Sequence, residues 1–277
     1  MGEEINHSGE EWSSRTRTLI GDDVLSRLAN ARVCVVGVGG VGGYAAEMLA
    51  RSGVGHLTLI DADTVAASNI NRQLIALQST VGQPKTDLFA RRFRDINPAV
   101  SIDARQEFIT PEAIGRLLDE GYDYVVDAID TVAPKVALIA ECMRRSVPVV
   151  SSMGAGGRTD ASKVEITDLW QTSEDGLARA VRQRLKKMGL RRPLKVAASR
   201  EAPHRHALIA LNEQNKRSSF GTLATIPALF GIHLASYVIN KIISSDKIVS
   251  HNIVSDNIVS DNIVSERIIS SEADSGQ

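Results

Sequence analysis

The chain has 277 residues, of which 43% are hydrophobic and 23% charged, enough apolar material for one or two globular domains. Its 32 Lys and Arg residues nearly balance its 33 Asp and Glu residues, so the composition excludes a globally basic nucleic-acid binder but not a local basic patch. Two cysteines, Cys34 and Cys142, are too few for a disulfide framework or a four-cysteine zinc site.

Strands and helices alternate through the first half of the sequence. Aromatic residues make up only 4% of the chain, so the core must consist mainly of Val, Ile, Leu and Ala. Short apolar runs predict strands over 32–36, 56–60, 100–104, 124–126 and 147–151. Helical periodicity and capping signals predict helices over 21–30, 41–51, 85–97, 111–120 and 133–145. This alternation predicts an α/β fold with a Rossmann-like, mostly parallel sheet and helices on both faces.

The pattern is weaker after residue 152. We expect a strand over 162–168, a helix over 174–188 and an irregular segment over 189–215. The apolar stretch 220–243 predicts a final helix. Its longest apolar run, 226–239, is shorter than the ~20 residues of a membrane span, so it favours a buried core helix. The polar first residues resemble neither a secretory nor an organellar signal. We therefore expect a cytoplasmic protein. The alternative is a protein associated with the mitochondrial surface.

The last residues form a repeat. Isoleucine recurs every five residues from Ile248 to Ile268, a period that fits neither a helix nor a strand. A pentapeptide β-solenoid would need several repeats for each stacked coil. We therefore expect a disordered low-complexity tail over 246–277.

A glycine-rich segment, Gly37-Val38-Gly39-Gly40-Val41-Gly42-Gly43, directly follows the first predicted strand and opens a helix. Glycines at this place let the backbone approach phosphate oxygens, and the helix N-terminus offers unpaired N–H groups to them. Asp61 stands at the end of the second predicted strand, where it can accept hydrogen bonds from ribose hydroxyls. The two features predict nucleotide binding, and on their own they make NAD the default ligand.

Polar residues beyond Asp61 favour a triphosphate instead. A dehydrogenase needs an apolar nicotinamide slot, whereas Arg72 and Lys85 can bind and polarise the phosphates of a nucleoside triphosphate. Asp127 and Asp130 follow the fourth predicted strand, at the edge of the sheet where ligands of such folds bind. One of these two carboxylates is expected to hold Mg²⁺ against the phosphates.

The segment 17–152 resembles the E1-like (ThiF/MoeB/HesA) adenylating superfamily, which includes ubiquitin-activating enzymes and bacterial sulfur-carrier activators. The residues that carry the resemblance are Gly37, Gly39, Gly40, Gly42, Asp61, Asp63, Ser68, Asn69, Asn71, Arg72, Gln73, Lys85 and Asp130. Within the superfamily the sequence is most similar to the tRNA threonylcarbamoyladenosine dehydratase branch. That similarity rests on the segments 97–98, 124–130, 134–135, 154–157 and 220–231.

The resemblance implies ATP-dependent adenylation of a carboxylate. In the dehydratase branch this is the threonyl carboxylate of N6-threonylcarbamoyladenosine in the tRNA anticodon loop, which then cyclises as AMP leaves. The implied cofactors are ATP and Mg²⁺. The resemblance implies that Asp61 and Asp63 bind the ribose and that Asn69, Arg72 and Lys85 bind the phosphates. It implies that Asp130 binds the metal. The other residues implied to line the nucleotide pocket are Gln73, Gly37, Gly39, Gly40 and Gly42.

Arg17 resembles an arginine that related enzymes insert into the site of a partner subunit, which implies a homodimer; Arg15 is the rival for this role. The implied catalytic residues are thus Arg17, Arg72, Lys85 and Asp130. The resemblance leaves open a sulfur-relay partner of the cysteine desulfurase type. It also divides the chain into a flexible N-terminus over 1–14, an ATP-binding and adenylating domain over 15–245, and the tail.

Two other functions remain open from the sequence. The first alternative is an E1-like enzyme that adenylates the C-terminus of a ubiquitin-like or sulfur-carrier protein. The absence of two CxxC zinc pairs, and of any cysteine after Met153, argues against it. The second alternative is an NAD-dependent oxidoreductase or a degenerate nucleotide-binding scaffold.

A basic segment independently favours a tRNA substrate. Between Arg179 and Arg205 the sequence has ten basic residues against one carboxylate, Glu201. Ordinary solvated helices mix both signs of charge, whereas a one-sign segment suits the phosphate backbone of RNA. The basic residues are Arg179, Arg182, Arg184, Lys186, Lys187, Arg191, Arg192, Lys195, Arg200 and Arg205. We therefore expect a tRNA-binding insertion over about 174–215.

Overall fold

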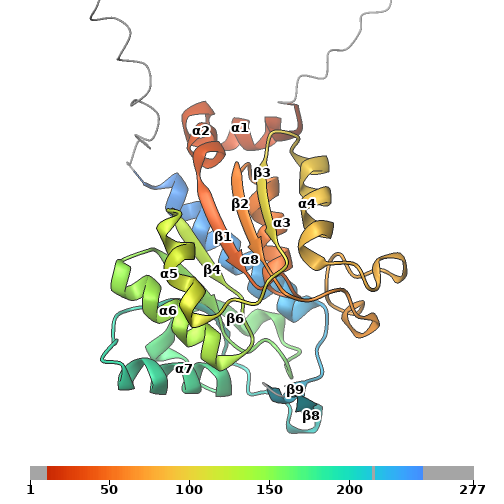
Figure 1. Ribbon diagram of the computed structural model, residues 1–277, viewed down its shortest axis with the longest axis vertical. Coiled ribbons are helices and arrows are strands. Elements are labelled where there is room, and N and C mark those ends of the chain that lie inside the picture. Colours follow the sequence, from red (N-terminus) through yellow and green to blue (C-terminus); the bar gives the residue numbers. More distant parts are fainter. Residues whose placement is uncertain (1–10, 214–215, 246–277) are drawn as a thin grey trace, which may run out of the picture. The chain divides into compact units, whose positions relative to one another are not determined.

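The structure is a computed structural model that describes residues 11–213 and 216–245. Side chains within 210–219 are outside the description, as is the predicted repeat tail. The described residues form a seven-stranded sheet of order β3-β2-β1-β4-β5-β7-β6 and a separate β8–β9 hairpin (Figure 1). The strands are β1 (Arg32–Val36), β2 (His56–Ile60), β3 (Ser101–Arg105), β4 (Tyr124–Asp127), β5 (Val149–Ser152), β6 (Val164–Asp168), β7 (Lys195–Ser199), β8 (Leu208–Glu213) and β9 (Lys216–Phe220).

The sheet is parallel from β3 through β7, and β6 pairs antiparallel with β7 at one edge. The helices are α1 (Ser14–Ile20), α2 (Asp22–Asn30), α3 (Gly42–Arg51), α4 (Lys85–Ile96), α5 (Pro111–Asp119), α6 (Val132–Arg145), α7 (Gly176–Lys187) and α8 (Thr225–Ile243). The predicted α/β fold with a mostly parallel sheet is confirmed. The strand order reverses between β1 and β4, which is where open α/β sheets form their binding crevice.

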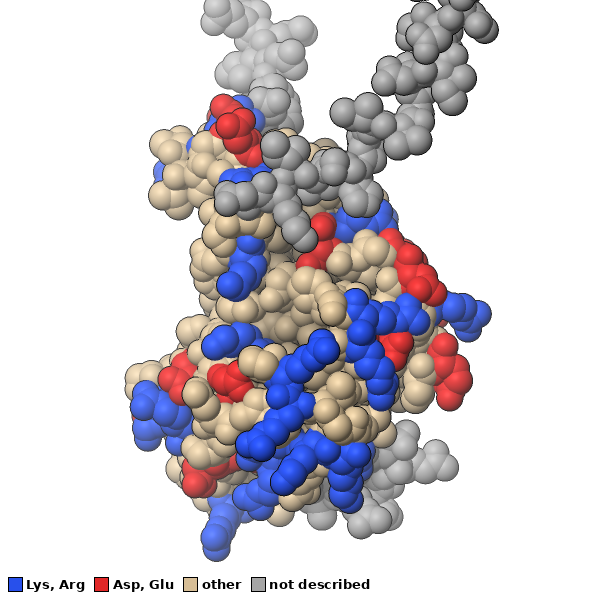
Figure 2. Space-filling model, turned by 90° about the vertical axis from the view of Figure 1, so that its left-hand side faces the viewer, with Lys and Arg blue, Asp and Glu red and all other residues tan. Residues whose placement is uncertain are grey.

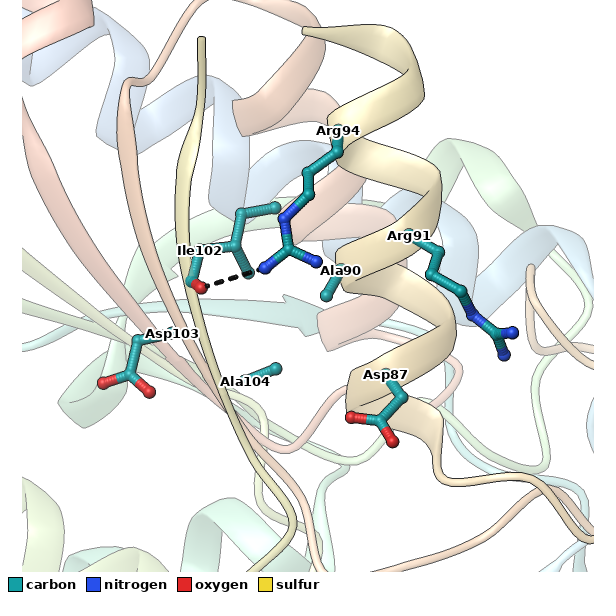
Figure 3. Close-up of a pocket in the computed structure, with 7 residues that line it drawn as sticks. All are labelled: Asp87, Ala90, Arg91, Arg94, Ile102, Asp103 and Ala104. Carbon is teal, nitrogen blue, oxygen red and sulfur yellow. Dashed lines mark hydrogen bonds between the residues drawn. The ribbon is translucent and has the colours of Figure 1, made fainter. Parts of the chain in front are cut away.

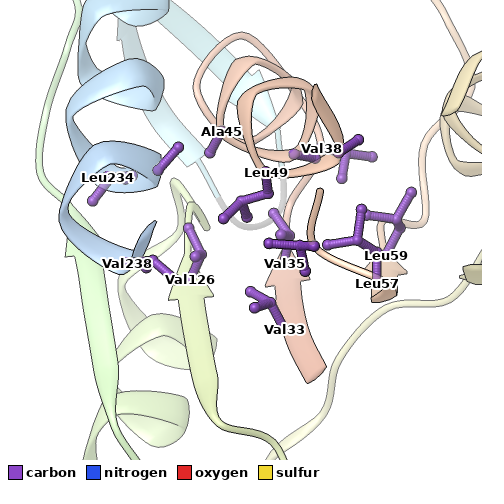
Figure 4. Close-up of a cluster of buried hydrophobic side chains, with 14 of the residues drawn as sticks. Val33, Val35, Val38, Ala45, Leu49, Leu57, Leu59, Val126, Leu234 and Val238 are labelled. Atoms are coloured by element: carbon purple, nitrogen blue, oxygen red, sulfur yellow. The ribbon is translucent and has the colours of Figure 1, made fainter. Parts of the chain in front are cut away.

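Alternating residues of the central strand build the core on both faces of the sheet. Val33 and Val35 of β1 pack with α3 and α8, beside Leu234 and Val238 (Figure 4). Cys34 and Val36 of the same strand point to the opposite face, where α5 and α6 cover them. Because successive strand residues point to opposite faces, the part of a strand that is covered on both sides must be apolar, as β1 is from Val33 to Val36.

Helix α8 is the final core helix that the sequence predicts. By length and composition it is a weak candidate for a membrane span. In this fold one side of it packs against α3 and the sheet, with Ile226, Phe230 and Leu234 fully buried. A Cβ atom on Gly231 would lie 2.3 Å from the carbonyl oxygen of Val41, so the two helices touch without an intervening side chain.

The prediction of an irregular segment over 189–215 is wrong, because β7 lies within it and fills the sheet between β5 and β6. The strand is short and contains two alanines, which have low β propensity, so pairing with distant strands rather than local preference defines it. The first helix was expected at 21–30, but α1 precedes it, and Gly21 with φ +83° separates the two helices.

We predict that Gly231→Ala lowers the free energy of unfolding by about 1–3 kcal/mol, because the added methyl group overpacks the α3–α8 contact. The control is Gly115→Ala in α5, where the nearest atom is the flexible end of Arg145. Alanine there should be neutral or stabilising by up to about 1 kcal/mol. Denaturant titration measures both variants, and equal effects would contradict the close helix contact.

Candidate active site

The glycine-rich turn lies between β1 and α3, at the point where the strand order reverses. Gly37 has φ +86°, and a Cβ atom on it would lie 2.9 Å from the carbonyl oxygen of Ala128, which follows β4. A Cβ atom on Gly42 would lie 1.8 Å from the carbonyl oxygen of Gly37. These positions therefore require glycine. The amide of Gly43 donates to the carbonyl oxygen of Gly39 at 3.0 Å. Val41, the residue before α3, has no side chain that can cap the other amides of the first turn, and these are the groups that an anion would bind.

Asp61 holds this turn in place from the end of β2. Its Oδ2 accepts a hydrogen bond from the amide of Val38 at 2.8 Å, and its Oδ1 accepts one from the amide of Asp63 at 2.9 Å. The side chain is 10% exposed. Burial raises the pKa of Asp61 above its ordinary value, and the ammonium group of Lys85 acts in the opposite direction. The carboxylate thus supports the backbone of the turn.

Lys85 is the first residue of α4, and its side chain is only 5% exposed. Its Nζ donates a hydrogen bond to Oδ2 of Asp63 at 2.7 Å and lies 3.8 Å from Oδ1 of Asp61. The Asp63 side chain is 70% exposed, so it can turn into solvent and leave Nζ to another anion. A nearly buried cation in this position suits a phosphate oxygen.

Arg72 and Gln73 pack directly on the glycine-rich turn. Cγ of Arg72 lies 3.4 Å from the position of a Cβ atom on Gly40, and Nε2 of Gln73 lies 3.6 Å from the corresponding position on Gly39. Gln73 is 8% exposed, and its Oε1 has no hydrogen-bond partner among the residues that the structure describes. A buried acceptor without a partner costs roughly 1–3 kcal/mol, so this atom marks a place for a donor from a ligand or water.

Asn69 fixes the backbone that carries Arg72 and Gln73. Its carbonyl oxygen accepts hydrogen bonds from the amides of both residues, at 3.0 and 2.9 Å. Its side-chain Oδ1 accepts one from the amide of Ala66 at 3.1 Å. The guanidinium group of Arg72 donates from Nη1 to the carbonyl oxygen of Ser68 and to Oδ1 of Asn71, each at 2.9 Å. Two of the three predicted phosphate-binding residues, Asn69 and Arg72, therefore share one structured loop against the turn, and the third, Lys85, comes from α4.

Of the two carboxylates that the sequence leaves open for a metal, the structure excludes Asp127. Its Oδ2 accepts hydrogen bonds from Nζ of Lys135 and Oγ of Ser151, both at 2.5 Å, and Asp127 and Lys135 are fully buried. Its Oδ1 accepts one from the amide of Ile129 at 3.1 Å, which fixes the loop beside Gly37. This cluster was not predicted from the sequence, although a lysine among the apolar residues of helix α6 is a signal for it.

Asp130 is the remaining candidate, exposed in the loop between β4 and α6 and two residues from Ala128. No group of three or more His, Cys, Asp or Glu residues suited to a metal occurs in the described part of the chain. A Mg²⁺ ion bound to a nucleotide needs only one or two protein carboxylates, because phosphates and water supply the other ligands. The donor set of this loop fits such an ion.

Arg17 lies away from the glycine-rich turn of its own chain. It belongs to α1, which together with α2 lies at the end of the sheet where β1 begins (Figure 1). Its Nε is 3.3 Å from Oδ1 of Asp22. The turn follows the opposite end of β1, so Arg17 does not join the other predicted site residues within one subunit.

A cavity of about 530 Å³ lies elsewhere, between α4 and the edge strand β3 (Figure 3). Arg91, Arg94 and Asp87 line its helical side, and Nη2 of Arg94 donates to the carbonyl oxygen of Ile102 at 3.5 Å. None of its lining residues belongs to the glycine-rich turn. This cavity therefore lies beside the edge strand of the sheet and is separate from the predicted nucleotide pocket.

Comparison with known proteins assigns the chain to a family. The model of the ThiF family matches residues 13–275. The chain belongs to the ThiF family. A tRNA threonylcarbamoyladenosine dehydratase of Bacillus subtilis is 47% identical to this ThiF-family chain over 190 residues, which cover 69% of the chain and 75% of that protein.

Solved structures agree with this assignment. The Escherichia coli tRNA N6-threonylcarbamoyladenosine dehydratase in complex with ATP is 38% identical and has a TM-score of 0.78, covering 84% of this chain and 94% of that one. The molybdopterin-synthase adenylyltransferase of Escherichia coli is 40% identical over 124 residues, but these cover only 45% of this chain and 49% of that protein. Similarity to the dehydratases thus extends further along this ThiF-family chain.

We predict that Lys135→Met lowers the free energy of unfolding by about 3–5 kcal/mol, because it leaves the buried Asp127 carboxylate without its cation. The control is Lys163→Met, which removes a solvent-exposed pair with Asp160 and should cost less than about 1 kcal/mol. Urea unfolding of both variants gives the comparison. A similar loss in the two would show that the buried pair has no special role.

Proposed function

We propose that this ThiF-family protein is an ATP-dependent tRNA threonylcarbamoyladenosine dehydratase. The observation that carries the proposal is the convergence of Arg72, Gln73 and Lys85 near the glycine-rich turn, with a buried acceptor and a nearly buried cation close to a helix start that no side chain caps. Relatives named for this activity, one of them solved with ATP, support it.

The reaction adenylates a carboxylate and then closes a ring. A carboxylate oxygen of the threonyl group attacks the α-phosphorus of ATP, and the bond to pyrophosphate breaks. A neighbouring atom of the same side chain then loses its proton and bonds to the acyl carbon, and AMP leaves with the oxygen that it gained. Activation is needed because hydroxide is a poor leaving group, whereas AMP is a good one. The net change is loss of water from the nucleoside at the cost of ATP.

The residues of the site contribute position and charge. Arg72 and Lys85 neutralise the phosphates as negative charge moves onto pyrophosphate, and the amides of the turn bind phosphate oxygens. Asp61 keeps the turn in place and, with Asp63, accepts hydrogen bonds from the ribose. Asp130 would hold Mg²⁺, which adds positive charge beside the phosphates.

The region 174–215 supplies a surface for the tRNA backbone within the adenylating domain 15–245. Figure 2 shows Lys and Arg side chains gathered on the side of the molecule where α5, α6 and α7 lie in Figure 1. Nine of the ten basic residues predicted for this role are exposed. The tenth, Arg182, is partly buried and donates to the carbonyl oxygens of Leu169 and Thr172, so it supports the fold. Affinity for tRNA should therefore fall steeply with salt.

The alternative of an activator for a ubiquitin-like or sulfur-carrier protein has less support, since similarity to such an adenylyltransferase covers under half of the chain. Burial raises the pKa of both Cys34 and Cys142, that of Cys142 to about 12, so neither is a thiolate at neutral pH. A sulfur-relay partner and association with the mitochondrial surface stay predictions, and we propose a cytoplasmic enzyme.

We predict that Arg72→Gln and Lys85→Gln each lower the rate of AMP release roughly hundredfold, because each removes a positive charge that stabilises the departing pyrophosphate. The substrate is tRNA that carries N6-threonylcarbamoyladenosine, and mass spectrometry of the digested nucleosides follows the cyclised product. Arg91→Gln, which removes an exposed charge of α4 that the proposal gives no role at the nucleotide, is the matched control and should be unaffected. Activity retained in both site variants would remove the phosphate assignments.

The homodimer is tested by mixing two inactive variants. We expect Arg17→Ala and Lys85→Ala to be inactive alone, because each lacks one component of every site. If Arg17 acts in the partner's site, a hybrid dimer contains one site with both residues intact, and coexpression restores up to about half of the activity per dimer. No restoration in purified hybrid dimers, or a monomer by sedimentation, would contradict the proposed arrangement.

A further inference from the structure

A second cavity, of about 410 Å³, lies beside the start of α7. The residues that line it include the apolar Pro203, Leu208 and Phe220 and the basic Arg179 and Arg205. This volume is typical of sites for small ligands, and the mixture of an aromatic ring with two cations suits a ligand that has both a flat apolar part and negative charge.

The aromatic wall is fixed by the turn that follows β5. A Cβ atom on Gly157 would lie 2.8 Å from Cδ1 of Phe220, and one on Gly156 would lie 2.7 Å from its Cβ. The amide of Gly157, which has φ +73°, donates to the carbonyl oxygen of Gly221 at 2.9 Å. Two glycines are thus needed to seat Phe220, so its position is set before any ligand binds.

The charges of the cavity favour an anion. The carboxylate of Asp175 is already engaged, accepting from the amides of Gly154 and Ala178 at 2.9 and 2.8 Å and lying 3.4 Å from Nη2 of Arg158. Glu174 is the other carboxylate of the wall and is exposed. Within the described ranges neither Arg179 nor Arg205 pairs with a carboxylate, so both remain available to phosphate groups.

A hydrogen bond links the segment after Phe220 to the predicted phosphate-binding loop. Two residues beyond Phe220, the carbonyl oxygen of Thr222 accepts a hydrogen bond from Nδ2 of Asn71 at 3.0 Å. Asn71 precedes Arg72, which packs on Gly40 of the glycine-rich turn. Two extended residues span at most about 7 Å, so the ring and the phosphate-binding loop are close neighbours.

We propose that this cavity binds the purine nucleotide of the RNA that carries the reacting carboxylate. The base stacks on Phe220, and the phosphates on either side of it are held by Arg179 and Arg205. Single-stranded loops of RNA are recognised in this way, by bases that stack on aromatic side chains while basic groups bind the backbone. The assignment rests on the proposed dehydratase function and adds the residues that select its substrate.

The test uses the full-length protein and an anticodon stem-loop RNA that carries N6-threonylcarbamoyladenosine. We expect Phe220→Leu, Arg179→Gln and Arg205→Gln each to raise the KM for this RNA roughly tenfold, since stacking and phosphate contacts of this kind contribute on the order of that factor. The affinity for ATP, measured by calorimetry, should not change. Arg116→Gln, an exposed charge on α5 outside the cavity, is the matched control and should keep the wild-type KM.

A competition experiment separates the cavity from general backbone binding. The free nucleoside N6-threonylcarbamoyladenosine should compete with the stem-loop in the wild type and compete at least fivefold more weakly in Phe220→Leu. If all three variants keep the wild-type KM and inhibition, the cavity assignment is wrong, although AMP release by the wild type would still support the dehydratase. If the wild type releases no AMP with the modified RNA, the proposed function itself fails and the assignment fails with it.

Discussion

The whole site depends on how closely the ends of β1 and β4 approach each other. At this point the carbonyl oxygen of Ala128 occupies the space that a side chain on Gly37 would need, and the first residue of α3 meets the carbonyl oxygen of Gly37 in the same way. The contact leaves no room for a side chain on either glycine. Asp61 and the buried Asp127–Lys135 pair brace this arrangement from β2 and β4. The binding crevice is therefore a consequence of sheet topology together with three buried charges.

Two further side chains, those of Lys85 and Gln73, show how the site can be structured before a nucleotide binds. Lys85 is nearly buried, yet its hydrogen-bond partner Asp63 is mostly exposed and can be exchanged for a phosphate oxygen. Gln73, which packs on the same turn, has a buried acceptor, Oε1, without a hydrogen-bond partner among the described residues. The fold thus holds a cation and a hydrogen-bond acceptor in positions where a nucleotide would supply their partners. Such preorganisation reduces the free energy spent on rearrangement when the ligand binds.

The sequence predicted the parts of the structure that depend on local patterns. The apolar runs and the glycine-rich turn located β1, β2, β4 and α3, because a strand covered on both faces must be apolar throughout. It did not predict β7, whose alanines have little strand preference and whose place comes from pairing with β5 and β6. The strand pattern alone also left Asp127 and Asp130 equivalent, since both follow the same strand, and only the family resemblance favoured Asp130. The position of Lys135, one turn into α6, distinguishes them, and this partnership becomes visible only in three dimensions.

The central claim is that a carboxylate oxygen of the RNA attacks the α-phosphorus of ATP, and oxygen-isotope transfer tests it most directly. The threonyl carboxylate of the modified tRNA is labelled with ¹⁸O, the enzyme completes its turnover, and the AMP that it releases is analysed by mass spectrometry. The account predicts one ¹⁸O atom in the phosphate of AMP for each molecule cyclised. Label that appears in inorganic phosphate, or cyclisation that leaves AMP unlabelled, would contradict it.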